Sequence, residues 1–136
     1  MPATFGPDHP DTATVLANLA AILAALGRHT EALPLRQRAV AITEAALGPD
    51  HPNTATRLAS LAHTFWALGQ HTQALPLEQR ALAIAEAALG PTTATVRENL
   101  AVTLDALGRH TEAVAVREHL PTATPPAHRG PGTSGP

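Results

Sequence analysis

Leucine and alanine recur near the start of the chain at the three- and four-residue spacing of one helical face. The positions on this face are Leu16, Leu19, Ala20, Leu23 and Leu26. This period predicts an amphipathic helix over residues 12–26, with the leucine stripe turned toward a neighbouring element. Gly27 follows at once, and glycine is the residue that most often stands just past a helix C-terminus.

A second helical pattern begins near Thr30. We expect Thr30 to be the N-cap, because its hydroxyl can accept a hydrogen bond from an amide of the first turn. Glu31 then suits the positive end of the helix dipole. Apolar positions continue to Leu47, and Gly48-Pro49 predicts the end. Pro34 is expected within about the first turn, where a missing N–H costs least.

This helix–turn–helix pattern is copied along the chain. Residues 27–48 return as residues 69–90 with 17 of 22 positions identical, and a shorter copy starts at Gly108. Gly27 and Gly69 are 42 residues apart, and Gly69 and Gly108 are 39 apart. A fixed period of this size indicates stacked units and not one globular core. The later helices are expected over 53–68, 72–89, 93–107 and 111–120.

The copies divide the chain into segments. We expect repeats at 12–48, 53–90 and 93–120 (the last truncated), after a linker or repeat remnant at 1–11 and before a disordered tail at 121–136. Residues 4–10 echo 46–52, which suggests that the chain is a fragment of a longer array or a shortened copy from one. The tail is rich in Pro and Gly and has few large apolar groups, so it cannot offset the entropy of ordering.

Composition favours an all-α fold and excludes several kinds of site. Aromatic residues make up 2% of the chain, and the apolar mass is alanine and leucine, which suits close helix packing better than a sheet. The net charge of −2 gives no footprint for nucleic acid, and the absence of Cys excludes disulfides and thiolate sites. With no membrane-length apolar run and no signal-peptide pattern, we expect no membrane association and a cytoplasmic location.

The histidines follow the repeat and do not form a metal motif. His9 and His51 fall in linkers, and His29, His71 and His110 fall in turns. Successive copies should be roughly 10 Å apart, too far to share one ion. HExxH, GxSxG, GxGxxG and P-loop patterns are absent, so we expect no enzyme, cofactor or metal. We expect a solvated outer face to carry the charged residues of the second helices, namely Arg36, Arg38, Glu78 and Arg80.

Small residues at fixed places in each copy resemble the tetratricopeptide repeat (TPR). They are Ala20, Ala62 and Ala101 in the first helices, Gly27, Gly69 and Gly108 in the turns, and Ala32, Ala74 and Ala113 in the second helices. The longer period and the GPDHP linker look like the kinesin-light-chain subtype, which also occurs in bacterial multidomain proteins. One departure stands out: Arg36, Glu78 and Arg117 occupy the place of a large aromatic residue late in the second helix.

The resemblance implies a right-handed α-solenoid of three helix pairs, whose first helices line a concave groove. The groove face would hold Thr56, Ala59, His63, Trp66, Glu98, Val102 and Asp105. Trp66 is the expected anchor, since large aromatic residues dominate binding at interfaces; the alternative is that it only fills a gap between helices. Glu98 and Asp105 would favour a partner with a basic residue.

The predicted function is therefore a non-catalytic protein–protein interaction module that binds a peptide segment of a partner. The alternative is a regulatory or sensor repeat domain detached from a bacterial STAND-type signalling ATPase. Because a stacked array must cover its terminal apolar faces, we also expect marginal stability or self-association through uncapped terminal repeats.

Overall fold

The computed structural model describes residues 9–88 and 93–118, and these form six helices with no strand. The helices are α1 (Pro10–Ala25), α2 (His29–Leu47), α3 (Pro52–Ala67), α4 (His71–Ala88), α5 (Thr93–Ala106) and α6 (His110–Arg117). The predictions for residues 1–8, 89–92 and 119–136 lie outside the described residues. The linker expected over 1–11 is wrong at its end, because α1 already begins at Pro10 with His9 as its N-cap.

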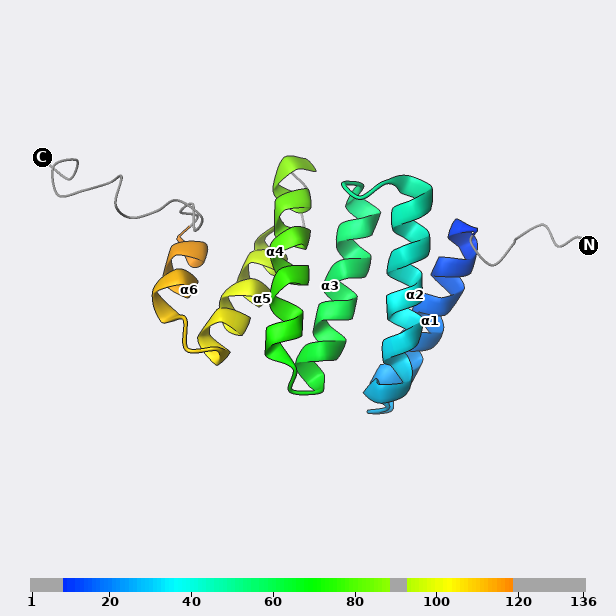
Figure 1. The fold of residues 1–136 in the computed structure, drawn as a ribbon, viewed down its shortest axis with the longest axis horizontal. Coiled ribbons are helices and arrows are strands. Elements are labelled where there is room, and N and C mark those ends of the chain that lie inside the picture. Colours follow the sequence, from blue (N-terminus) through cyan, green and yellow to red (C-terminus); the bar gives the residue numbers. More distant parts are fainter. Residues whose placement is uncertain (1–8, 89–92, 119–136) are drawn as a thin grey trace, which may run out of the picture.

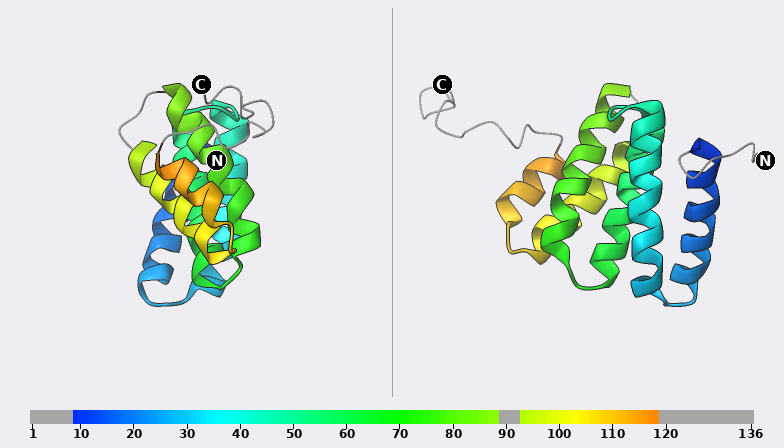
Figure 2. Two further views of the ribbon diagram at one scale, coloured as in Figure 1. Left: turned by 90° about the vertical axis from the view of Figure 1, so that its left-hand side faces the viewer. Right: turned by 45° about the vertical axis from the view of Figure 1, so that its right-hand side comes forward.

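The helices lie side by side in chain order, from α1 at one end to α6 at the other (Figure 1). Within pairs, α1 packs on α2, α3 on α4 and α5 on α6; between pairs, α2 packs on α3 and α4 on α5. Two further views show the same stacked row (Figure 2). The core is thus spread along the array in successive interfaces, which confirms the predicted α-solenoid of three helix pairs.

Glycine ends the first helix of every pair in a left-handed conformation. Gly27, Gly69 and Gly108 have φ angles of 78°, 77° and 80°. The residue after each glycine donates its N–H back to a carbonyl of the helix; for example, Arg28 N lies 2.8 Å from Leu23 O. This geometry satisfies the last carbonyls of the helix and turns the chain sharply into the second helix.

The second helices begin earlier than expected, and the predicted cap at Thr30 is wrong. Helix α2 starts at His29, its N-cap is Arg28, and no side chain caps it. The reason is that the tight turn leads straight into the helix, so that Ala32 N already donates to Arg28 O at 3.1 Å. Pro34 therefore lies inside α2, beyond the first turn, and Pro76 lies inside α4.

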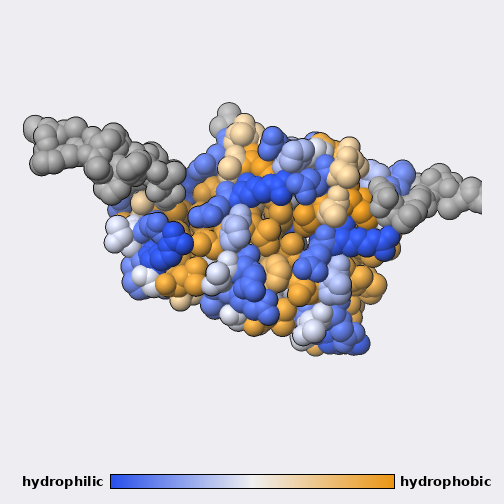
Figure 3. Space-filling model, in the orientation of Figure 1, coloured by the Kyte–Doolittle hydropathy of each residue, from blue (hydrophilic) through white to orange (hydrophobic). Residues whose placement is uncertain are grey.

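Alanine occupies fully buried positions in every helix pair. The six repeat alanines that carry the family resemblance are all 0% exposed: Ala20, Ala32, Ala62, Ala74, Ala101 and Ala113. Small side chains at these places let the backbones of paired helices approach closely. On the face where α2 lies in front of α1 and α4 in front of α5, hydrophilic side chains interrupt the hydrophobic surface (Figure 3).

The leucine stripe is buried in the middle of the array and partly exposed at its first helix. In α3, Leu58 and Leu61 are 1% and 6% exposed. In α1, the corresponding stripe leaves Leu19 at 46% and Leu26 at 65%. Helix α2 covers this side of α3, whereas no helix among residues 9–88 and 93–118 precedes α1. We call the exposed set on α1 and its C-cap the α1 edge: Val15, Leu19, Ile22 and Leu26.

The last helix is shorter than predicted. Helix α6 ends at Arg117, with Glu118 as its C-cap, whereas the sequence predicted a helix up to Leu120. Its apolar residues Ala113 and Val116 are buried against α5, and Val114 is 50% exposed.

Candidate functional site

A hollow runs between α3 and α5, the first helices of the second and third pairs. It consists of two adjoining pockets of about 290 and 210 Å³ that share Ala59, His63 and Asn99. The larger pocket is also lined by Arg36, Ala55, Thr56, Ser60, Thr95 and Val96, and the smaller by Trp66, Glu78 and Val102. We call the two pockets together the α3–α5 groove.

Arg36 of α2 reaches the larger pocket from the neighbouring pair. Its Nη1 donates to Thr64 Oγ1 at 2.7 Å and to Ser60 O at 3.2 Å, both on α3. The side chain is partly buried at the α2–α3 junction, and burial lowers the pKa of the Arg36 guanidinium. The two acceptors hold the charge in place at this end of the groove.

Glu78 of α4 lines the smaller pocket and is 5% exposed. Its Oε1 has no hydrogen-bond partner among the residues that the structure describes, and neither has Oγ1 of the buried Thr103. Burial raises the pKa of Glu78 to about 7, against a smaller lowering by the neighbouring Thr103 hydroxyl. A buried carboxyl with one unpaired oxygen is costly to ionise, so burial favours its neutral form.

The expected solvated outer face is wrong for two of its four residues. Arg38 is exposed, and Arg80 pairs with Glu44, but Arg36 and Glu78 face the first helix of the next pair. They occupy corresponding places in their repeats, where packing directs the side chain into the junction and not to solvent. The sequence could have indicated this burial, because the family has a large aromatic residue at the position that Arg36 and Glu78 occupy.

Most of the predicted groove residues line the hollow. Thr56, Ala59 and His63 line the larger pocket, and Ala59, His63, Trp66 and Val102 line the smaller. The ring of Trp66 meets that of His71 edge-on, with centroids 4.8 Å apart, and the side chain remains 38% exposed. Trp66 thus both packs against the turn and presents a surface to the groove.

His63 is the titratable ring of the groove. Burial lowers its pKa, and the charges of Arg36 and His29 lower it further. The His29 ring lies beside it, with centroids 6.5 Å apart. His63 is therefore neutral at neutral pH and offers the groove a hydrogen-bonding ring without charge.

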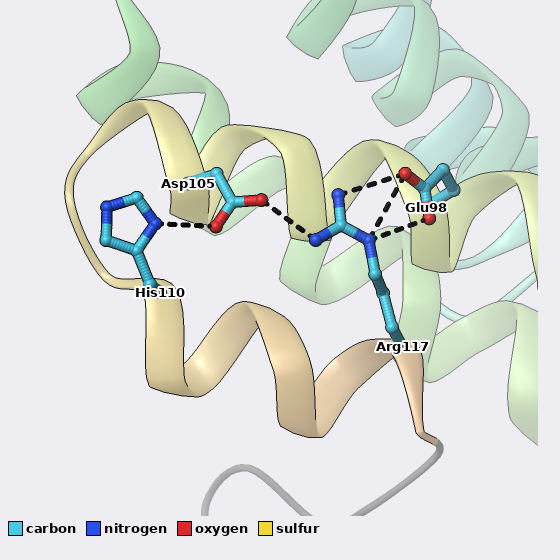
Figure 4. A network of polar contacts seen from close by, with 4 residues as sticks. All are labelled: Glu98, Asp105, His110 and Arg117. Carbon is cyan, nitrogen blue, oxygen red and sulfur yellow. Dashed lines mark hydrogen bonds and ion pairs between the residues drawn. The ribbon is translucent and has the colours of Figure 1, made fainter.

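Glu98 and Asp105 lie on α5 but do not line either pocket. Both bind Arg117 of α6: Arg117 Nη2 lies 3.0 Å from Glu98 Oε2, and Nη1 lies 2.8 Å from Asp105 Oδ2 (Figure 4). His110 Nδ1 adds a contact of 2.9 Å to Asp105. Hydrogen bonds from Arg117 lower the pKa of both carboxyls. The single positive charge of Arg117 thus offsets part of their negative charge within the third pair.

Two other kinds of site find no support in residues 9–88 and 93–118. No group of three His, Asp or Glu side chains there could hold a metal ion. No helix in these ranges is long and apolar enough to cross a membrane.

Sequence-family models of the tetratricopeptide repeat match residues 11–87 and 93–118. No curated protein matches the chain. Among solved structures, the nearly identical TPR-like repeats of a protein described as a kinesin light chain from Podosopora anserina are 29% identical, with a TM-score of 0.80. The match covers 85% of this chain and 56% of that one, as does the match to a single-site variant of the same repeats.

BtubC (BKLC) from P. vanneervenii has the same fold, at 24% identity and a TM-score of 0.67. That match covers 88% of this chain and 52% of the other. The chain thus spans about half of the length of these structures.

Proposed function

The chain belongs to the tetratricopeptide repeat family, with repeats like those of kinesin light chains, and on that premise we propose that it binds a peptide segment of a partner protein in the α3–α5 groove. TPR repeats are generally protein–protein interaction modules. The observation that carries the proposal is the continuous hollow, lined by five of the seven residues predicted for the groove face. In this role the chain is a non-catalytic module.

The lining suits an extended or helical segment with at least one large side chain. Trp66 and Val102 supply apolar surface at one end, and both are partly exposed. Thr56, Thr95 and Asn99 supply polar groups along the groove, where they can meet main-chain amides of a partner. Partly exposed aromatic residues in such hollows dominate binding energies at interfaces.

A peptide library selected against the protein tests this proposal. Ala59 borders both pockets, so Ala59→Leu fills the groove without changing a charge. The matched control is Ala45→Leu on the exposed side of α2. We expect peptides that bind the wild type and Ala45→Leu equally and lose about tenfold or more affinity for Ala59→Leu.

Recovery of the same peptides by Ala59→Leu would contradict groove binding, as would a selection that enriches no peptide. Isothermal titration of three or four selected peptides gives the comparison. Circular dichroism of the two variants shows whether each keeps its helices.

We also propose self-association through the α1 edge. Its four apolar side chains are between 46% and 65% exposed, whereas Leu61, the counterpart of Leu19 in α3, is buried in a core cluster with Val40 of α2. A second copy can cover them only by association, which depends on concentration. Thermal melting over a tenfold range of concentration should show a rising midpoint that Leu19→Gln removes. An unchanged midpoint together with a monomer by light scattering would reject self-association.

The cytoplasm stays the predicted location. The alternative role, a sensor domain of a signalling ATPase, also stays a prediction; a neighbouring coding frame with a P-loop would favour it.

A further inference from the structure

Glu78 is buried in a pocket wall without a partner for Oε1. The equivalent residue of the preceding repeat is Arg36, at the junction between α2 and α3, and it donates hydrogen bonds to two acceptors on α3. On α5 the Thr103 hydroxyl interacts with the Glu78 carboxyl and lowers its pKa, but it carries no charge that could pair with the carboxylate. Buried acids without partners are rare in folded proteins and mark places where a ligand can supply the missing group.

The chain's own arginines near the groove are engaged elsewhere. Arg36 binds Ser60 and Thr64, Arg80 binds Glu44 and the carbonyl of Pro49, and Arg117 binds Glu98 and Asp105. None of these contacts reaches Glu78. A cation for Glu78 would therefore come from outside the described residues.

The smaller pocket has the shape and lining for such a cation. Its volume of about 210 Å³ opens between α3 and α5, with Glu78 of α4 in its lining. Trp66 offers an aromatic ring, and Asn99 offers an amide that can accept or donate. An indole ring attracts a cation placed over its face, and the attraction strengthens where water is excluded.

We propose that this end of the α3–α5 groove receives a basic side chain, lysine or arginine, of the bound partner segment, with its charged group paired to Glu78 and its stem against Trp66. This inference rests on the proposed function of the groove and names the chemistry of its occupant. It differs from the expectation that Glu98 and Asp105 attract a basic partner, since those two carboxylates already bind Arg117. In this proposal, the charge that selects a basic side chain is that of the buried Glu78 on α4.

The single tryptophan of the chain makes the pocket directly observable. Trp66 is the only Trp, so its fluorescence reports on this site alone. The probes are short alanine-based peptides with one central arginine or lysine. Their neutral counterparts carry citrulline or acetyl-lysine at the same place. We expect a saturable change in Trp66 emission with the basic peptides and none with the neutral ones.

Glu78→Gln keeps the shape of the side chain and removes its charge. We expect it to weaken binding of the better basic peptide by about tenfold, since the interaction lost is a charge-assisted one in a buried place. Asp50→Asn is the matched control, because Asp50 is exposed in the linker between α2 and α3. It should bind like the wild type. Comparison of the arginine and lysine peptides shows which cation fits better.

The pH dependence separates a charge pair from simple packing. His63 on α3 is the other titratable group that lines this pocket, and α5 contributes Asn99 and Val102. Between about pH 6 and about pH 8, binding to the wild type should strengthen as Glu78 ionises, because its pKa lies near neutrality. Glu78→Gln retains His63 and should show a flat profile.

Equal binding of neutral and basic peptides would overturn the inference, as would unchanged affinity of Glu78→Gln. So would the absence of any fluorescence response to basic peptides up to about 10 mM, the weak end of specific binding. The library selection distinguishes this failure from that of the proposed function. Peptides that need the groove but ignore Glu78→Gln would leave the groove function standing and remove the basic side chain from it.

Discussion

The two junctions between helix pairs have the same architecture and opposite chemistry. At the α2–α3 junction, Arg36 donates to Thr64 Oγ1 and Ser60 O. At the α4–α5 junction, Glu78 stands in place of the arginine, opposite Thr103. Within residues 9–88 and 93–118, Glu78 Oε1 and Thr103 Oγ1 each have no hydrogen-bond partner. Thr64 and Thr103 are each 0% exposed, so the difference comes from one residue of the second helix.

This difference shows that repeats of the same fold can have one junction whose polar groups are hydrogen-bonded and a next junction that leaves an acceptor unpaired. The arginine closes its junction because it can satisfy several acceptors at once. The glutamate leaves its junction with an unmet acceptor beside a pocket. The repeats share one fold, and the residue at a single position, Arg36 or Glu78, determines whether the polar groups of a junction bind each other or stay available to a ligand.

Exchanging the residue types should have the largest effect. Arg36→Glu would place an unpaired acid in the first junction and remove two hydrogen bonds to α3. We expect the free energy of unfolding to fall by about 2–4 kcal/mol. Urea denaturation measures it, with Arg36→Met as the control that removes the same bonds without burying an acid. Equal free energies of unfolding for Arg36→Glu and Arg36→Met would show that an acid at the α2–α3 junction has no cost of its own.

Neutralising the second junction should act in the opposite direction. The pKa of Glu78 is raised from 4.5 to about 7 in the fold, so folding favours its neutral form. This contribution to stability is fully present below about pH 4.5 and is lost as pH rises through about 7. At pH 8, Glu78→Gln should therefore be more stable than the wild type by about 1–2 kcal/mol, with allowance for solvent screening.

The same pair of proteins compared near pH 4.5 should be almost equally stable. Denaturation curves at the two pH values give the test. A stabilisation that is the same at both would show that the charge of Glu78 is not its cause.

The two buried threonines sharpen the comparison further. Thr64→Val removes an acceptor of Arg36 and should cost about 1 kcal/mol. Thr103→Val removes a hydroxyl whose Oγ1 has no geometric hydrogen bond within residues 9–88 and 93–118 and which interacts only with the Glu78 carboxyl, so it should cost less than Thr64→Val. The two substitutions are identical in chemistry and in burial, so each is the control for the other. Equal losses would mean that the hydroxyls serve their junctions alike.

The smallest effect is expected at the third position of this register, Arg117. It binds Glu98 and Asp105 at an exposed place (Figure 4), where ion pairs add little to stability. Arg117→Ala should leave the denaturation midpoint almost unchanged. The carboxyl pKa of Asp105, followed by NMR, should rise toward its usual range, because hydrogen bonding to Arg117 is the main cause of its lowering. An unchanged pKa would contradict the pairing.

Sequence predicted the parts of the fold that depend on neighbours along the chain. Helix spans and the glycine turns follow from spacing and turn chemistry, whereas the binding role of the groove face of α3 stays a prediction. The burial of Arg36 and Glu78 and the pairing of Glu98 with Arg117 depend on how separate helices are rotated against each other. Glu98 and Arg117 are 19 residues apart, and nothing local fixes that rotation. The prediction of an N-cap at Thr30 is wrong for a local reason, because the tight turn leads directly into the helix.

Leu19 and Leu61 hold the same place in their repeats, yet one is 46% exposed and the other 6%. A consensus motif averaged over the three copies would give these leucines equal weight. Tolerance to substitution in this chain should instead follow whether a neighbour occupies that side of the helix. In the monomer, substitution of Leu19 should therefore cost less stability than substitution of Leu61, and only association through the α1 edge would constrain Leu19.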